Sequence, residues 1–185
     1  KCVVKQLQEG GTTMSTVLDG DLEQKGGISL TSPDFDDGGR LPDSAGYANE
    51  NRSPRLEIDG VPDDAETLVL LMDDPDAQPV AGHTWIHWVV WDIDASVEAF
   101  PEEWDGSGAT VGYNDFLEQG YGGPSPPEGT GTHGYRFKLL ALDSELGAPE
   151  TARVARLGSV IAMNAEVLAS TQIVGKYDPE QGTAF

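Results

Sequence analysis

Residues 72–94 have the sequence MDDPDAQPVAGHTWIHWVVWDID, and this stretch decides the fold. It joins the end of an apolar run that begins at residue 66 to a segment rich in tryptophan, valine and isoleucine. Both segments are typical of buried β-strands. The proline between Asp74 and Asp76 makes the connection rigid, because its ring fixes φ and removes an N–H. We therefore predict strands at 66–74 and 83–94, and a turn between them that can aim an acid into a pocket.

The second of these strands carries a histidine, His87, in its middle. A strand period of two puts His87 on the same face as three other residues, Trp85, Val89 and Trp91. A buried imidazole needs a hydrogen-bond partner, and Asp74 or Asp76 is the expected one. These groups can be interpreted as a metal site, a general acid–base pair, an anion pocket or a satisfied part of the core. The strand context alone favours a core histidine.

The remaining elements predict a mainly β protein. Alternating or apolar segments predict further strands at 27–34, 56–60, 135–143 and 171–178. Apolar residues at helical spacing predict one helix at 151–170. Because the strands do not alternate with helices, we expect a sandwich or Greek-key sheet with an appended C-terminal helix.

The long loop at 96–134 ends in PSPPEGTGTHGY, residues 124–135. Prolines and glycines at this density set the shape of a loop through φ restrictions, so we expect an ordered and functional segment. The loop leads to His133 and Tyr135, which share one face of the strand that follows, whereas Gly134 points away.

The composition limits the class of protein. The chain has 185 residues, enough for one domain, and a formal net charge of −21 from 32 acidic and 11 basic residues. An acid excess of this size disfavours nucleic acids and anionic membranes as partners. Because the acids are distributed along the chain, we expect a salt-adapted protein from a halophilic archaeon, whose medium screens self-repulsion.

The sequence also suggests a location and domain limits. One cysteine excludes an internal disulfide, and no apolar run approaches the roughly 20 residues of a membrane helix, so we expect a cytoplasmic protein. We expect residues 1–26 to be a partly disordered N-terminal extension and residues 27–180 to be the domain. Residues 1–13 differ in character from the rest, and Met14-Ser15 resembles a natural start.

Three motifs in this order resemble the phosphatidylethanolamine-binding protein (PEBP) family. They are DPDA at 74–77, W-x-H-W at 85–88, and a glycine- and proline-rich segment followed by H-x-Y at 123–135. Flanking segments at 29–42, 51–62 and 112–116 agree in order and spacing. The resemblance covers about residues 27–180 and is nearest to the bacterial and archaeal Raf-kinase-inhibitor-like (YbhB/YbcL) branch.

This resemblance implies a two-sheet antiparallel β fold with a small pocket for phosphate-like anions, such as phosphate or a phosphorylated head group. It implies pocket residues at Asp74, Asp76, Trp85, His87, Ser125, Pro126, His133 and Tyr135. The histidines and the tyrosine would supply N–H and O–H donors, and Asp74 would hold one histidine in its tautomer. His83 has no place in the pattern. The family usually has an arginine where this chain has Gly134, so we expect weaker binding of a dianion.

Other functions remain open at this stage. Asp74, Asp76, His87 and His133 could bind a metal and activate water in a hydrolase, although their spacing matches no common ligand motif. Some relatives inhibit kinases or proteases, so regulation of a protein partner is a further possibility. The hypothesis of a protein that binds a small anion has more support, and it involves no catalytic residue, no cofactor and no resident metal.

Overall fold

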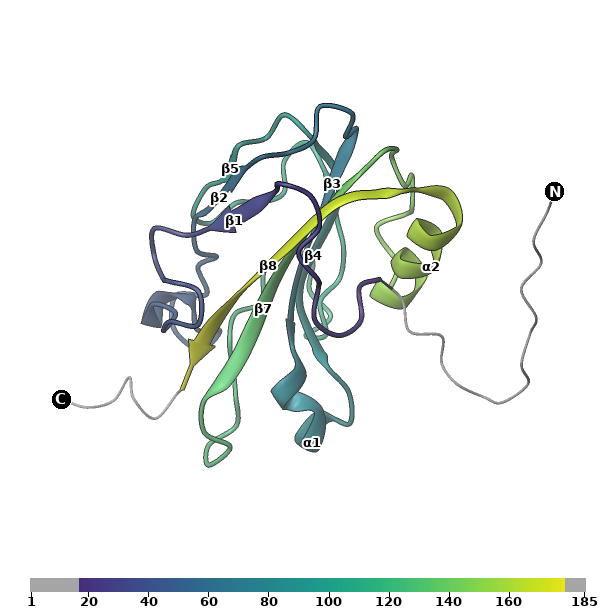
Figure 1. The fold of residues 1–185 in the computed structure, drawn as a ribbon. Helices are drawn as coiled ribbons and strands as arrows, with labels where there is room; N and C mark the ends of the chain where they lie inside the picture. Colours follow the sequence, from purple (N-terminus) through teal and green to yellow (C-terminus); the bar gives the residue numbers. More distant parts are fainter. Residues whose placement is uncertain (1–16, 179–185) are drawn as a thin grey trace.

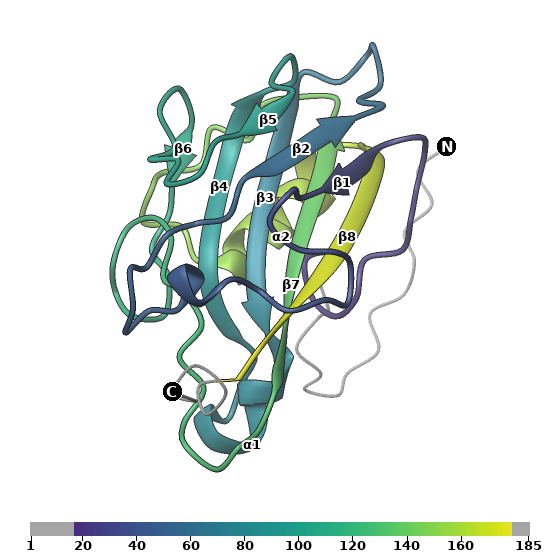
Figure 2. The same ribbon diagram turned by 90° about the vertical axis from the view of Figure 1, so that its left-hand side faces the viewer.

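Residues 17–178, as described by a computed structural model, form two antiparallel sheets (Figures 1 and 2). The larger sheet has the strand order β6-β4-β3-β7-β8, and the smaller has the order β1-β2-β5. The strands of the larger sheet are β3 (Thr67–Asp74), β4 (Trp85–Asp94), β6 (Thr110–Val111), β7 (His133–Leu142) and β8 (Val167–Tyr177). Those of the smaller sheet are β1 (Ser29–Thr31), β2 (Leu56–Asp59) and β5 (Ala99–Phe100). The predicted mainly β, two-sheet antiparallel fold with a C-terminal helix is confirmed.

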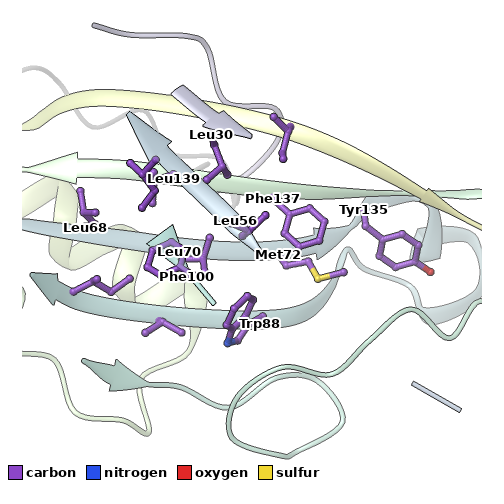
Figure 3. Close-up of a cluster of buried hydrophobic side chains, with 14 of the residues drawn as sticks. Leu30, Leu56, Leu68, Leu70, Met72, Trp88, Phe100, Tyr135, Phe137 and Leu139 are labelled. Atoms are coloured by element: carbon purple, nitrogen blue, oxygen red, sulfur yellow. The ribbon is translucent and has the colours of Figure 1, made fainter. Parts of the chain in front are cut away.

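Strand alternation gives the larger sheet a core on each face. On β3, Leu70 and Met72 point into the core between the two sheets, whereas Val69 and Leu71 point to the opposite face. There they are covered by helix α2 (Val154–Asn164). Figure 3 shows the core between the sheets, with Tyr135 at its end and the hydroxyl of this residue directed away from the other side chains.

The C-terminal helix is shorter than the sequence predicts. It ends at Asn164, and the last residues of the predicted helix belong to β8, which pairs with β7 from Val167 onward. The alanines in this segment allow either structure, so backbone pairing with a long neighbouring strand overrides a weak helical preference. The short helices η2 (Pro75–Ala77) and α1 (Gln78–Ala81) fill what was expected to be a simple turn, and β4 begins two residues later than predicted.

A bulge in β4 corrects the predicted face of His87. Met72 pairs with Trp88 and Asp73 pairs with Ile86, so His87 is an extra residue on its strand. The bulge shifts the alternation. Val89 and Trp91 therefore pack on the α2 side, whereas the ring of His87 contacts Tyr135 on the other face. The prediction that His87 shares a face with Val89 and Trp91 was wrong. The bulge depends on how β4 pairs with β3, and the alternation of residues within β4 does not reveal it.

Part of the expected N-terminal extension packs on the domain. The side chain of Leu18 is buried in the α2-side core, and Lys25 pairs with Ser170 of β8 through two backbone hydrogen bonds. These contacts attach residues 17–26 to the larger sheet. Residues 1–16 and 179–185, including those expected to precede the natural start, lie outside the described range. Within residues 17–178, no helix has both the length and the apolar character needed to cross a membrane.

Candidate functional site

At one end of the larger sheet, β3 ends and β7 begins beside α1 (Figure 2). A cavity of about 190 Å³ lies at this end. Six residues that the sequence analysis assigned to the site line it: Asp74, Trp85, His87, Ser125, Pro126 and His133. The other lining residues are Ala77, Val80, Ala81, Phe116 and Pro127. The wall is therefore mainly apolar, and neither lysine nor arginine is among these described lining residues.

Asp74 and His133 form a buried pair in the cavity wall. The Nδ1 atom of His133 lies 2.7 Å from Oδ2 of Asp74, and both residues are almost fully buried. The other carboxylate oxygen, Oδ1, accepts hydrogen bonds from the backbone amides of Asp76 and Ala77 in the rigid turn. Since a carboxylate only accepts, Nδ1 of His133 carries a proton, and Asp74 sets the orientation of the ring.

His87 has a different partner from the one the sequence predicts. Its Nδ1 lies 2.6 Å from the carbonyl oxygen of Gly122, and the amide of Gly122 donates back to the carbonyl of His87 at 2.8 Å. Asp74 is committed to His133, so the prediction that Asp74 or Asp76 bonds His87 was wrong. Burial lowers the pKa of His87, although the nearby carbonyl of Gly122 and the charge of Asp74 act in the opposite direction.

The loop that bonds His87 is held by a close backbone approach. The amide of Gly123 donates to Oδ1 of Asn51 at 2.7 Å, and a Cβ atom at Gly123 would lie 1.9 Å from the carbonyl oxygen of Ala45. No side chain larger than hydrogen fits there without movement of the backbone. Gly123 therefore lets the loop approach closely enough to place the carbonyl of Gly122 at His87.

Two buried donors around the cavity have no hydrogen-bond partner among the described residues. They are the indole N–H of Trp85, which lines the cavity, and the hydroxyl of Tyr135. Tyr135 stands behind the wall, and its ring packs against those of His87 and His133. Burial, together with the charge of Asp74, raises the pKa of Tyr135, so its hydroxyl keeps its proton. A buried donor without an acceptor costs free energy, which a ligand oxygen would recover.

The histidines supply fewer donors than the sequence analysis expected. Nδ1 of His133 bonds Asp74, and Nε2 of His133 lies 3.0 Å from the hydroxyl of Thr130. Nδ1 of His87 is bonded to Gly122, and only Nε2 of this ring remains. The free donors around the cavity therefore come from Trp85 and Tyr135, because the protein itself already bonds three of the four imidazole nitrogens.

Like Tyr135, Asp76 and His83 are not among the residues that line the cavity. The carboxylate of Asp76 accepts a hydrogen bond from the backbone amide of Gly134 at 2.8 Å, which ties the turn after β3 to the start of β7. His83 is exposed, and its ring stacks on Trp85 and lies 3.3 Å from a carboxylate oxygen of Asp115.

The sequence analysis missed Phe116, Gly122 and Thr130. Phe116 packs edge-on against both Trp85 and His87, and it lies in a segment noted only for its family resemblance. Gly122 contributes a backbone carbonyl, for which a sequence carries no signal. Thr130 lies in the loop that the density of proline and glycine marked as ordered, and that density was the available signal.

The metal-dependent alternative gains no support from these contacts. Within residues 17–178, no group of three or more His, Cys, Asp or Glu side chains lies together as a metal site would require. Asp74 and His133 bond each other, and Asp76 and His87 bond backbone groups.

Behind the cavity, on the α2 side of the sheet, lies a second buried carboxylate. Asp73 accepts two hydrogen bonds from the guanidinium of Arg136, at 2.7 and 2.9 Å, and one from Lys138 at 2.8 Å. Lys138 also donates to the carbonyl of Leu18, and Arg136 donates to Asp21. Among the described acidic residues, Asp73 and Asp74 alone are buried.

Comparison with known proteins gives one consistent family. The family model described as phosphatidylethanolamine-binding protein matches residues 31–178. A UPF0098 protein of Aquifex aeolicus is 39% identical over 155 residues, which are 81% of this chain and 88% of the relative. A UPF0098 protein of Methanothermobacter thermautotrophicus is 36% identical, over 81% of this chain and 98% of its own.

A solved structure agrees with the sequence matches. The crystal structure of Escherichia coli YbcL, described as a new member of the mammalian PEBP family, has a TM-score of 0.74 to this chain. The two chains are 31% identical, and the match covers 82% of this chain and 98% of YbcL.

Proposed function

The chain belongs to the phosphatidylethanolamine-binding protein family, and on this premise we propose that its cavity binds a small anionic group, such as phosphate or a phosphorylated head group. The observation that carries this proposal is the unpartnered indole N–H of Trp85, shielded from water in the cavity wall. An anion oxygen in the cavity would accept a hydrogen bond from this indole.

The size of the cavity supports a small group and not a whole lipid. Cavities for drug-sized ligands have volumes of roughly 300–1,000 Å³, whereas this one has about 190 Å³. The exposed Val80 and the prolines at its mouth give any substituent on the anion an apolar surface to rest on.

A titration tests this proposal. Phosphate and O-phosphorylethanolamine are added at about pH 6 in about 1 M KCl, which screens the acidic surface. The ring signals of the three histidines are followed by NMR. We expect saturable shifts for His87 and His133, small shifts for the exposed His83, and loss of the response in His87→Ala. Unchanged ring signals up to about 10 mM of both compounds would overturn the proposal.

We further propose that the mouth of this cavity contacts a protein partner, such as a kinase. Two large apolar side chains support this role, because Val80 is 58% exposed at the cavity and Leu117 is 69% exposed next to Phe116. Isolated exposed apolar residues are common, so the test compares capture of the same partner from an extract in molar salt by wild type and by a Val80→Asp, Leu117→Asp variant. Equal capture by both would exclude this surface.

For the setting of this function we propose a cytoplasm rich in salt. The single cysteine and the net charge of −21 support it, as does the exposure of most described acidic residues. Screening of their repulsion should raise the midpoint of thermal unfolding as KCl increases toward molar concentrations. A midpoint that does not depend on KCl would contradict the proposed salt adaptation, and cell fractionation would test the location.

A further inference from the structure

The hydrogen bond to Gly122 determines which kind of group His87 presents to a ligand. A backbone carbonyl can only accept, and the short separation of 2.6 Å places the proton of the ring on Nδ1. Nε2 has no hydrogen-bond partner among residues 17–178, and it is the ring nitrogen left for the cavity. In the neutral ring, Nε2 carries a lone pair and accepts a hydrogen bond instead of donating one.

The surroundings of His87 favour the neutral ring. The side chain is 2% exposed and lies edge-on to the rings of Phe116 and Tyr135. Burial is the dominant influence and lowers its pKa. The ionisable groups on its face of the sheet are Asp74 on β3 and His133 and Tyr135 on β7, and the charge of Asp73 acts from the opposite face. The loop side contributes the backbone of Gly122 and Gly123 and the apolar ring of Phe116.

The rest of the wall makes a fully deprotonated anion a poor fit. Its only carboxylate, Asp74, is negative, and none of the described lining residues is lysine or arginine. The free donor in the lining is the indole of Trp85, since the hydroxyl of Tyr135 lies behind the wall. A ligand must therefore accept from this neutral donor and, at the same time, donate to the lone pair of His87.

We propose that the cavity selects a singly charged oxyanion that retains a P–O–H group, and that the hydroxyl of this ligand donates to Nε2 of His87. The chemical class is the phosphate monoanion, either a monoester such as a head group, with one acidic proton, or free dihydrogen phosphate, with two. The inference rests on the proposed function and adds the charge state of the ligand. The indole of Trp85 bonds an unprotonated oxygen, and the single negative charge reduces repulsion by Asp74.

The test compares two ligands of the same shape and charge that differ by one proton. Methyl phosphate below about pH 6 is a monoanion with a P–O–H group, whereas methyl sulfate is a monoanion without one. Affinities of the full chain for both are measured by NMR titration between pH 5 and pH 8 in constant KCl. The signal of the exposed His83 serves as an internal control.

At pH 5 we expect methyl phosphate to bind at least about tenfold more tightly than methyl sulfate, because the sulfate leaves the lone pair of His87 unsatisfied. The affinity for methyl phosphate should then fall by about 100-fold between pH 5 and pH 8 as its monoanion is lost. In His87→Gln, whose amide can also donate, the difference between the two ligands should shrink. Thermal unfolding of this variant checks its fold, and the wild-type pH profile does not depend on it.

Two results would overturn the inference and leave the anion pocket standing. One is equal affinity for the two ligands at pH 5, and the other is an affinity for methyl phosphate that rises with pH. If neither ligand binds between pH 5 and pH 8, and phosphate and O-phosphorylethanolamine also fail to bind, the proposed function itself falls.

Discussion

Asp73 and Asp74 are consecutive residues of β3, and they have opposite surroundings. Asp73 faces α2, where a guanidinium and an ammonium group surround its carboxylate with three charge-assisted hydrogen bonds. Asp74 faces the cavity, where its partners are one imidazole and two backbone amides. One strand carries both acids, yet the sheet separates two kinds of site. We call the side of Asp73 closed, because its charges are paired within the protein, and the side of Asp74 open, because it borders the cavity.

The difference shows how a structural and a functional use of a buried carboxylate can be told apart. In the Asp73 cluster every charged group has a charged partner, and each side-chain nitrogen of Arg136 and Lys138 makes at least one hydrogen bond. Around Asp74 two donors, on Trp85 and Tyr135, and one acceptor, on His87, have no partner within the described chain. Unsatisfied buried groups point to a ligand more clearly than buried charge does.

Loss of Asp73 should have the largest effect on stability. Asp73→Asn leaves the buried cations of Arg136 and Lys138 without their common carboxylate, and breaking such a cluster costs about 3–5 kcal/mol of unfolding free energy. Urea unfolding measures the change, with the exposed Asp64→Asn as the matched control. A loss no larger than that of the control would show that the cluster contributes little to stability.

Loss of Asp74 should cost less stability and change the cavity more. In Asp74→Asn the amide oxygen can still accept from the backbone amides of the turn, so we expect a loss of about 1–3 kcal/mol. The ring signals of His133 should shift, because Nδ1 loses its charged acceptor. If this variant proves less stable than Asp73→Asn, the distinction between the two faces fails.

Between about pH 5 and pH 7 the pH dependence of stability should reflect His87 on the cavity side of the sheet. The pKa of His87 is lowered in the folded protein and is about 6.5 in an unfolded chain. Below about pH 6.5 the unfolded state binds a proton that the folded state does not. The free energy of unfolding therefore decreases as the pH is lowered, by up to about 1.4 kcal/mol per pH unit. The loss ends at the folded pKa of His87.

Urea unfolding at several values between pH 5 and pH 7 measures this slope. His87→Gln should reduce the slope by the contribution of the one proton that His87 binds on unfolding. Asp21, Asp94 and Asp105, whose pKa values are lowered in the folded protein, act only below about pH 4, outside this window. An identical slope in wild type and variant would mean that another group is responsible.

The smallest expected effect comes from adding a permanent cation next to Asp76, beside the cavity. A Cβ at Gly134 would lie 3.5 Å from both Asp76 and Val174, which is ordinary contact, so a side chain fits there. Gly134→Arg should raise the affinity for phosphate by a factor of about two to five, since a solvent-exposed charge contributes up to about 1 kcal/mol. Gly134→Gln controls for packing, and an equal gain in both variants would exclude a charge effect.

The sequence predicts the strands well where many residues contribute to one pattern. The apolar run before Asp74 and the aromatic segment around Trp88 each give a long strand at nearly the predicted limits. The family motifs also identify the residues that the structure brings together around the cavity. The domain limits of 27–180, the ligand and the archaeal source stay predictions.

What the sequence could not predict depends on pairing between distant segments. The bulge that turns His87 toward Tyr135 arises from the register of β3 against β4. The partner of Asp74 is 59 residues away in the chain, so an acid near His87 was assigned to the wrong histidine. Arg136 and Lys138 occupy alternate positions of a strand and would ordinarily be expected in solvent.

The placement of two acids on opposite faces of β3 has a consequence for how the chain finds its fold. A slip of this strand by one residue would turn every side chain to the wrong face. Asp73 would enter the apolar space between the sheets in either direction of slip. A slip that brings Met72 to the place of Asp73 is penalised twice, because Arg136 and Lys138 would also meet an apolar residue in place of a carboxylate. The adjacent buried charges thus help to specify the register of the central strand during folding. They favour one alignment among several that apolar residues alone would tolerate.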